Sequence, residues 1–235
     1  MIIIVHKFEL VGVNMSRIRI FTGHFGSGKT EIALNYAINL AKIGKRVALV
    51  DIDIVNPYFC SRNMKDKLEN LGIKLISSSS SLMNAELMVI PSNVYSVFND
   101  KSYEVVMDIG GDDQGSLVLG QYNEYLKQES YDMYFVVNND RPFTSNKVET
   151  IAYMKSIERA SRLKVTHLIS NTNLSYETNT EDIIKGDKIV SEISKQFEIP
   201  YKYIVCTKDL AGMIKTKVHA EVYPIDIYMK PPWME

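Results

Sequence analysis

Residues 23–30 have the sequence Gly-His-Phe-Gly-Ser-Gly-Lys-Thr, which matches the phosphate-loop pattern G-x-x-x-x-G-K-[ST] at every position. Glycines at positions 26 and 28 allow the backbone to approach a phosphate group closely, and the N–H groups of such a loop attract anions. In sites of this type the lysine, here Lys29, contacts the outer phosphates, and the hydroxyl group of Thr30 binds Mg²⁺. The pattern therefore predicts a site for a nucleoside polyphosphate and Mg²⁺.

The residues on either side of this loop have the patterns of a strand and a helix. Residues 18–22 are β-prone and alternate in character, which is typical of a strand. Residues 31–43 place apolar side chains at helical spacing. A phosphate loop needs this order of elements, because the N-terminus of the following helix adds positive potential at the anion. The alternative, a glycine turn without phosphate chemistry, would require the strand, the motif and the helix to coincide by chance.

Acidic residues follow two later apolar runs. Residues 46–51 and 103–108 are nearly continuous apolar stretches, which are typical of strands buried on both faces of a parallel sheet. Ligands bind at the carboxyl ends of such strands. We expect Asp108 to hold Mg²⁺ through water, and Asp53 to orient the attacking water if its strand lies one removed from the first. Asp51 is an alternative for either role, and turn formation is the alternative for both early aspartates.

The remaining elements alternate in the same way. We expect further strands at 73–76, 131–138, 164–169 and 200–205, the last of these being the final strand, and helices at 116–128, 144–162 (capped by Thr144 or Ser145), 180–197 and 208–215. Asn138 and Asn171 follow two of these strands. The prolines of the C-terminal tail favour an extended segment. This alternation predicts an α/β fold, a P-loop nucleoside-triphosphatase with a mostly parallel central sheet and helices on both faces.

The chain has no linker or repeat that would divide it, so we expect one P-loop nucleotide-binding domain over residues 16–235. Residues 1–15 read as an N-terminal extension. Our hypothesis is that translation starts at Met15 and that the preceding residues are not native. The alternative is a genuine additional edge strand.

Composition excludes several classes of protein. The net charge of −1 provides no global field for nucleic acid or acidic lipid, and no apolar run approaches the length of a membrane span. Cys60 and Cys206 are far apart and lack C-x-x-C spacing, which argues against a disulfide framework, a zinc site or an iron–sulfur site within one chain. We therefore expect a cytoplasmic protein that binds neither membrane nor nucleic acid.

The three motifs together resemble a known family. Residues 23–30, the run Val-Ala-Leu-Val-Asp-Ile-Asp at 47–53 and the run Val-Val-Met-Asp-Ile-Gly-Gly at 105–111 are similar in order and spacing to the MinD/ParA-type (SIMIBI class) P-loop ATPases. That branch also contains nitrogenase iron protein, the arsenical pump ATPase and dethiobiotin synthetase. Within it, the chain looks like a bacterial subgroup of CobQ/CobB/MinD/ParA nucleotide-binding domains with D-x-D-x-V-N-P-Y-F and D-x-G-G-D motifs. The resemblance covers about residues 16–215.

The resemblance implies a role for each matching residue. ATP and Mg²⁺ are the implied cofactors, with Lys29 and Asp53 as catalytic residues and Thr30, Asp53 and Asp108 at the metal. Asn171 resembles the asparagine that reads adenine in this family, although Asn is also common in turns. The implied nucleotide-binding residues are Gly23, Phe25, Gly26, Ser27, Gly28, Lys29, Thr30, Glu31 and Asn171.

One position departs from the family pattern. Dimer-forming members carry a second lysine early in the loop, and His24 occupies that position here. A homodimer is therefore possible, but a lysine reaching across to the partner's nucleotide is absent. Two functions remain open: an ATPase that acts as a nucleotide-driven switch on a protein partner, and a small-molecule ATP-dependent enzyme similar to dethiobiotin synthetase. Nucleotide binding without turnover is a third.

Overall fold

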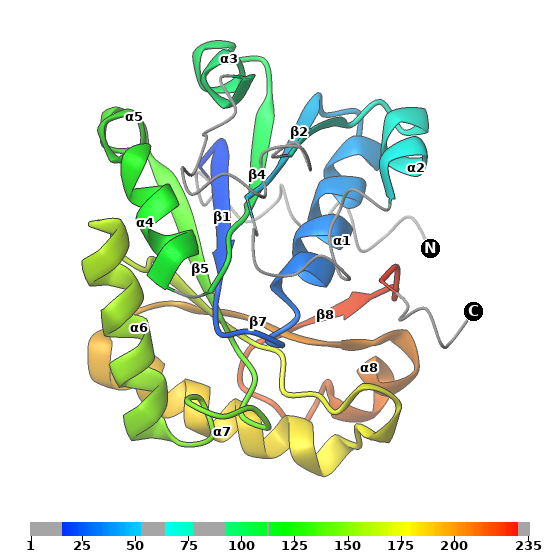
Figure 1. Cartoon of the computed structure of the whole chain (residues 1–235). Coiled ribbons are helices and arrows are strands. Elements are labelled where there is room, and N and C mark those ends of the chain that lie inside the picture. The colour runs from blue at the N-terminus through cyan, green and yellow to red at the C-terminus, as the bar shows by residue number, and fades with distance from the viewer. Residues whose placement is uncertain (1–15, 53–63, 78–92, 112, 230–235) are drawn as a thin grey trace.

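The computed structural model describes residues 16–52, 64–77, 93–111 and 113–229. In these residues one parallel sheet has the strand order β3-β2-β4-β1-β5-β6-β7-β8 (Figure 1). The strands are β1 (Ile18–Thr22), β2 (Val47–Asp51), β3 (Lys74–Ser77), β4 (Glu104–Asp108), β5 (Tyr131–Val137), β6 (His167–Ser170), β7 (Tyr201–Thr207) and β8 (Glu221–Ile225). β1 lies between β4 and β5, so the loop that follows it opens at the centre of the carboxyl edge.

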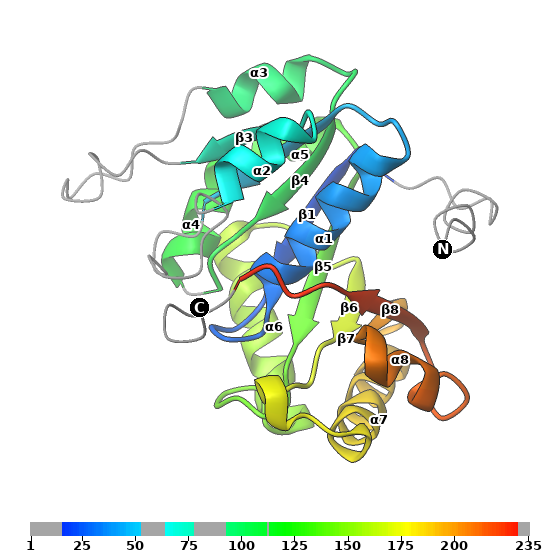
Figure 2. The same ribbon diagram turned by 90° about the vertical axis from the view of Figure 1, so that its right-hand side faces the viewer.

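Helices cover both faces of the sheet. α1 (Lys29–Lys42) and α2 (Lys65–Asn70) lie on one face (Figure 2). The other face carries α3 (Asn93–Asn99), α4 (Asp113–Gln121), α5 (Asn123–Gln128), α6 (Lys147–Ser161), α7 (Thr180–Phe197) and α8 (Lys208–Ile214). Within the described ranges, none of these helices is both long and apolar enough to cross a membrane. The predicted α/β P-loop fold is confirmed.

The core follows from the alternation of side chains along each strand. On β1, Ile18 and Ile20 pack toward α4 and α6, whereas Phe21 packs toward α1. β2, β4 and β5 are apolar on both faces and almost completely buried. Burying apolar area on both faces at about 25 cal/mol per Å² makes this central region the main source of stability. The carboxyl edge of the sheet therefore follows directly from its most completely buried strands.

Three sequence expectations were wrong in detail. The strand at 200–205 is not the last, because β8 pairs in parallel with β7 at the sheet edge. Pro224 is compatible with this position, since an edge strand does not need every N–H group for pairing. The helix expected at 116–128 is two helices, α4 and α5, which meet at Tyr122. The N-cap of α6 is Asn146, whose side chain accepts a hydrogen bond from the N–H group of Glu149 at 3.0 Å.

Candidate functional site

The loop between β1 and α1 has a backbone conformation that favours glycine at two positions. Gly26 and Gly28 have φ angles of 74° and 82°, in the left-handed region. A side chain at Gly28 would also overlap the amide group of Asn171. Ser27 and Lys29 are almost completely buried, whereas the Phe25 side chain is 58% exposed. The glycines thus let the loop turn sharply around the space where an anion would bind, ahead of the N-terminus of α1.

Two asparagines from neighbouring strands hold this loop in place. The amide nitrogen of Asn171, after β6, donates a hydrogen bond to the carbonyl oxygen of Ser27 at 2.7 Å. The amide nitrogen of Asn138, after β5, donates to the carbonyl oxygen of Gly26 at 3.3 Å. Both side chains are buried. The predicted position of Asn171 beside the nucleotide site is therefore accompanied by a bracing role that sequence reasoning missed.

The acidic side of the site lies across β4. Asp108 is fully buried at the end of β4, in register with Phe21 of β1 on one side and Asp51 of β2 on the other. The backbone after Asp108 runs directly against the phosphate loop, because a side chain at Gly111 would overlap the carbonyl oxygen of Gly23. β2 lies one strand away from β1, which is the condition set for Asp53. Asp53 itself lies outside the described residues.

Thr30 and Asp108 supply oxygen donors of the kind that Mg²⁺ prefers. Thr30 begins α1 and Asp108 ends the strand beside β1, so both belong to the same part of the carboxyl edge. The described residues contain no group of three or more His, Cys, Asp or Glu side chains placed to hold a metal ion. Phosphate oxygens and water would have to complete the octahedron, and Mg²⁺ commonly keeps several waters. The donor set therefore fits Mg²⁺ bound together with a polyphosphate.

A cavity of about 990 Å³ extends from the phosphate loop across the ends of β6, β7 and β8. At one end it is lined by Gly26, Gly28, Lys29 and Thr30. At the other end, apolar side chains from β7 and the C-terminal segment line it, among them Val205, Ile225, Ile227 and Met229. Pockets for nucleotides and other small ligands commonly combine apolar walls with a few placed polar groups. The volume of the cavity is sufficient for a nucleotide, and the charged residue Lys29 lies at the end of the cavity that the phosphate loop forms.

The wall formed by residues 225–229 is fixed to α1 (Figure 2). The Glu31 carboxylate accepts hydrogen bonds from the N–H groups of Tyr228 at 2.6 Å and Met229 at 2.9 Å. One turn later, the Asn35 side chain exchanges two hydrogen bonds with the backbone of Asp226. Burial raises the pKa of Glu31. Sequence reasoning placed Glu31 at the nucleotide; Glu31 lines the cavity, and its side chain also holds the C-terminal segment, a contact that sequence reasoning missed. The only sequence signal was two polar residues at i, i+4 on α1.

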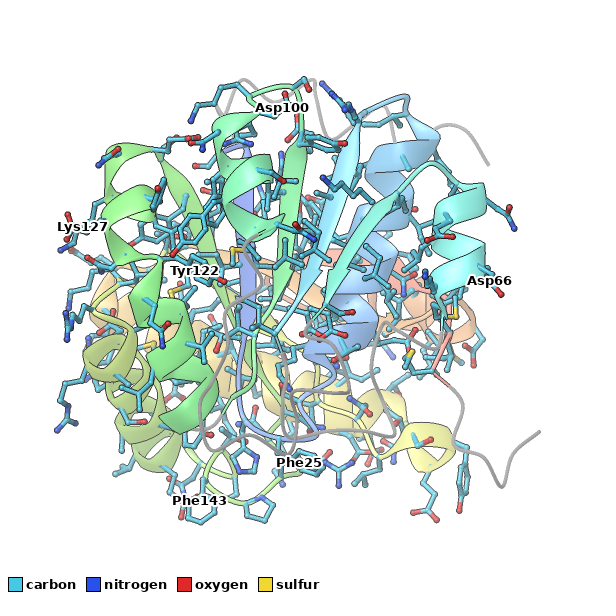
Figure 3. All side chains as sticks on the ribbon, turned by 45° about the horizontal axis from the view of Figure 1, so that its top comes forward. Phe25, Asp66, Asp100, Tyr122, Lys127 and Phe143 are labelled. Carbon is cyan, nitrogen blue, oxygen red and sulfur yellow. The ribbon has the colours of Figure 1, made fainter. Side chains whose placement is uncertain are left out.

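His24 lies in an aromatic setting beside the loop. Its ring centroid is 5.1 Å from that of Tyr153 and 5.5 Å from that of Phe143. Burial lowers the pKa of His24, and the positive charges of Lys29 and Arg141 lower it further. These effects favour the neutral imidazole, which would not replace the charge of the family's second lysine. Figure 3 shows Phe25 and Phe143 at the same end of the molecule, away from Asp100 at the amino edge.

Two solved structures of FtsY have the same fold. Cell division protein FtsY from Thermotoga maritima is 18% identical, with a TM-score of 0.54 over 83% of this chain and 64% of that chain. Chloroplast FtsY from Physcomitrella patens is 16% identical, with a TM-score of 0.53 over 82% and 59% of the two chains. A nucleotide-binding protein from Archaeoglobus fulgidus in complex with ADP is 16% identical, with a TM-score of 0.47 over 93% and 90%. The chain thus spans less than two thirds of the two FtsY chains.

One protein-family model matches the chain over the whole of the described sheet. The CobQ/CobB/MinD/ParA nucleotide binding domain matches residues 18–225, from the first residue of β1 to the last residue of β8. This range contains the phosphate loop, Asp108 and the two bracing asparagines. The chain therefore belongs to the CobQ/CobB/MinD/ParA family of nucleotide-binding domains.

Proposed function

We propose that the protein binds ATP with Mg²⁺, hydrolyses it, and acts as a nucleotide-driven switch. The observation that carries this proposal is the braced phosphate loop, which opens into a cavity with an apolar far end. The loop is held in place by the side chains of Asn138 and Asn171, which directly follow β5 and β6. An anion site formed before the ligand arrives avoids part of the ordering cost of binding.

At the phosphate end, each residue has a distinct task. The loop N–H groups and Lys29 bind the phosphate oxygens. The ammonium group of Lys29 stabilises the negative charge that develops on the outer phosphate during transfer. Thr30 and Asp108 would hold Mg²⁺, which neutralises phosphate charge when it is bound. We assign Asp53 to orient the attacking water by analogy with the family, so this assignment rests on the sequence alone.

Beside the phosphate loop, the side chain of Asn171 favours adenine. Its amide nitrogen donates one N–H group to the carbonyl oxygen of Ser27, so the side-chain oxygen and the second N–H group can meet a base. This donor–acceptor pair matches the amino group and N7 of adenine, whereas O6 and N7 of guanine are both acceptors and would leave the side-chain oxygen without a donor. Guanine-specific relatives also use an Asn-Lys-x-Asp run, and residues 171–174 are Asn-Thr-Asn-Leu. Both observations support ATP over GTP.

The proposed switch rests on the segment after β4. The backbone at Gly111 lies against Gly23 of the phosphate loop, and its carbonyl oxygen accepts a hydrogen bond from the Tyr153 hydroxyl group of α6. A change at the outer phosphate would therefore reach a surface helix through two direct contacts, which is the kind of bistable element that nucleotide switches use. We propose an as yet unidentified protein as the reader of this change.

Turnover by the purified protein tests this function. We expect slow hydrolysis of ATP in the presence of Mg²⁺ without a second substrate, and none in the Lys29→Ala variant. An absence of hydrolysis that is relieved by a small carboxylic acid would instead indicate an enzyme similar to dethiobiotin synthetase. Sedimentation of the protein with and without ATP would show in the same samples whether two copies pair.

We also propose that the protein is cytoplasmic. Cys206 is a free and largely buried thiol, and burial raises its pKa to about 11. A thiol of this kind is inert toward oxidation and is typical of proteins from reducing compartments. Fractionation of cells that express the tagged protein checks the location.

A further inference from the structure

Arg141 lies against the phosphate loop, although no sequence motif draws attention to it. It belongs to the segment between β5 and α6. A Cβ atom on Gly26 would be 3.0 Å from Nε of Arg141 and 3.5 Å from Cζ, so the guanidinium group lies directly over this glycine. Arg141 also lines the large cavity together with Gly28 and Lys29. The side chain is thus placed at the phosphate end of the proposed nucleotide site.

The backbone of Arg141 is held firmly by Asn138. The N–H group of Arg141 donates to the carbonyl oxygen of Asn138 at 3.3 Å, and the same carbonyl accepts the Thr144 hydroxyl group at 2.6 Å. The Asn138 side chain reaches across to the carbonyl oxygen of Gly26. One buried residue therefore fixes both the phosphate loop and the segment that carries Arg141, so the distance between them is set before any ligand binds.

One nitrogen of the Arg141 guanidinium group lacks a hydrogen-bond partner in the described part of the chain. Nε of Arg141 is buried there without an acceptor, while the carboxylate of the neighbouring Asp140 is close enough for the two charges to interact. A buried N–H group without an acceptor is costly, because it has lost its hydrogen bond to water. Lys29 and Arg141 both act on His24, which places the two cations on the same small region. An anionic ligand at this point would satisfy Nε of Arg141.

We propose that Arg141 is an additional donor to the polyphosphate, supplied by the segment after β5 rather than by the phosphate loop. This inference rests on the proposed nucleotide site and adds a residue to it. The planar guanidinium fork matches two oxygens of a phosphate group, which a lysine ammonium group cannot do. Arg141 therefore increases affinity for nucleotides that carry a β-phosphate and does not affect recognition of the base.

The test compares Arg141→Met and Arg141→Lys with the native protein by isothermal titration calorimetry. The ligands are ATP and ADP, each with Mg²⁺, and adenosine. We expect Arg141→Met to weaken binding of ATP and ADP by about tenfold to hundredfold, the usual size of a lost charge-assisted hydrogen bond. Arg141→Lys should recover part of the loss, because it restores the charge but not the fork. Binding of adenosine should not change, because adenosine has no phosphate.

Arg159→Met is a matched control, since Arg159 is exposed on α6 and distant in sequence from the loop. It should bind all three ligands as the native protein does. Native affinity of Arg141→Met for ATP would overturn the proposal. So would an equal loss for adenosine accompanied by a lower melting temperature, which would indicate a structural brace. If Lys29→Ala loses ATP binding and Arg141→Met does not, only the role of Arg141 fails; if neither loses it, the nucleotide site itself is wrong.

Discussion

Asn138 is the residue whose loss should affect both stability and ligand binding most clearly. Its side chain is fully buried and makes four hydrogen bonds. The amide nitrogen donates to the carbonyl oxygens of Gly26 and Asn173, and the side-chain oxygen accepts from the N–H groups of Asp140 and Asn173. These bonds join the phosphate loop to the segments after β5 and β6. Asn138→Ala removes all four.

The magnitude follows from this count. Each net hydrogen bond contributes about 1 kcal/mol, and some of the released backbone groups can reach water in the cavity. We therefore expect Asn138→Ala to lower the free energy of unfolding by about 3 kcal/mol. For a domain of this size, that corresponds to a decrease of roughly 6–12 °C in melting temperature. Binding of ATP should weaken at the same time, because the loop loses its preset shape.

Urea unfolding followed by circular dichroism measures the free energy, and titration calorimetry measures ATP affinity. Asn70→Ala, at an exposed position near the end of α2, is the control and should change stability by less than about 0.5 kcal/mol. Asn138→Asp retains both acceptor bonds but places a negative charge beside the phosphate site, so it should impair binding of ATP more than stability. If Asn138→Ala is as stable as the control and binds ATP normally, the bracing role is refuted.

Two further predictions concern residues placed by sequence at the nucleotide. Glu31→Gln keeps only one good acceptor for the N–H groups of Tyr228 and Met229, so hydrogen exchange at these amides should become faster while ATP affinity changes little; a large loss of affinity with unchanged exchange would return Glu31 to the nucleotide. Burial raises the pKa of Glu31 above its ordinary value of 4.5, so the folded state favours the protonated form. The stability of the native protein should therefore fall as the pH rises above 4.5, whereas this contribution is absent from the Glu31→Gln variant. Asp53→Asn should retain ATP binding and lose hydrolysis, as measured by phosphate release; hydrolysis at the native rate would assign the water to Asp51 or another group.

The phosphate loop could be predicted from sequence because its chemistry is local. One short motif sets the glycines, the lysine and the hydroxyl group, and the strand and helix patterns lie next to it. The sequence left the order of β2, β4 and β1 open and stated it only as a condition for Asp53; the sheet meets that condition, because β4 lies between β2 and β1. The burial of these strands on both faces left little freedom in their placement.

The contacts that sequence missed join residues far apart in the chain. Glu31 accepts hydrogen bonds from Tyr228 and Met229, which lie 197 and 198 positions later in the chain. No sequence periodicity connects an acid on a helix to backbone N–H groups in a C-terminal segment. β8 was missed because Pro224 and the polar residues near it weaken the strand pattern, although an edge strand tolerates proline. Thr144 resembled a helix N-cap, but its hydroxyl group donates a hydrogen bond to the carbonyl oxygen of Asn138. Local propensity cannot show which of several polar residues is already engaged elsewhere.

The central claim is that this loop binds the phosphates of ATP. The most direct test is titration of ATP and GTP, each with Mg²⁺, into the native protein and into Lys29→Ala, whose fold is checked by circular dichroism. We predict that the native protein binds ATP at least about tenfold more tightly than GTP, since polar groups left unpaired by the wrong base cost about 1–3 kcal/mol each, and that Lys29→Ala binds neither. Equal or tighter binding of GTP would contradict the role of Asn171, and normal binding of ATP by a folded Lys29→Ala protein would contradict the site itself.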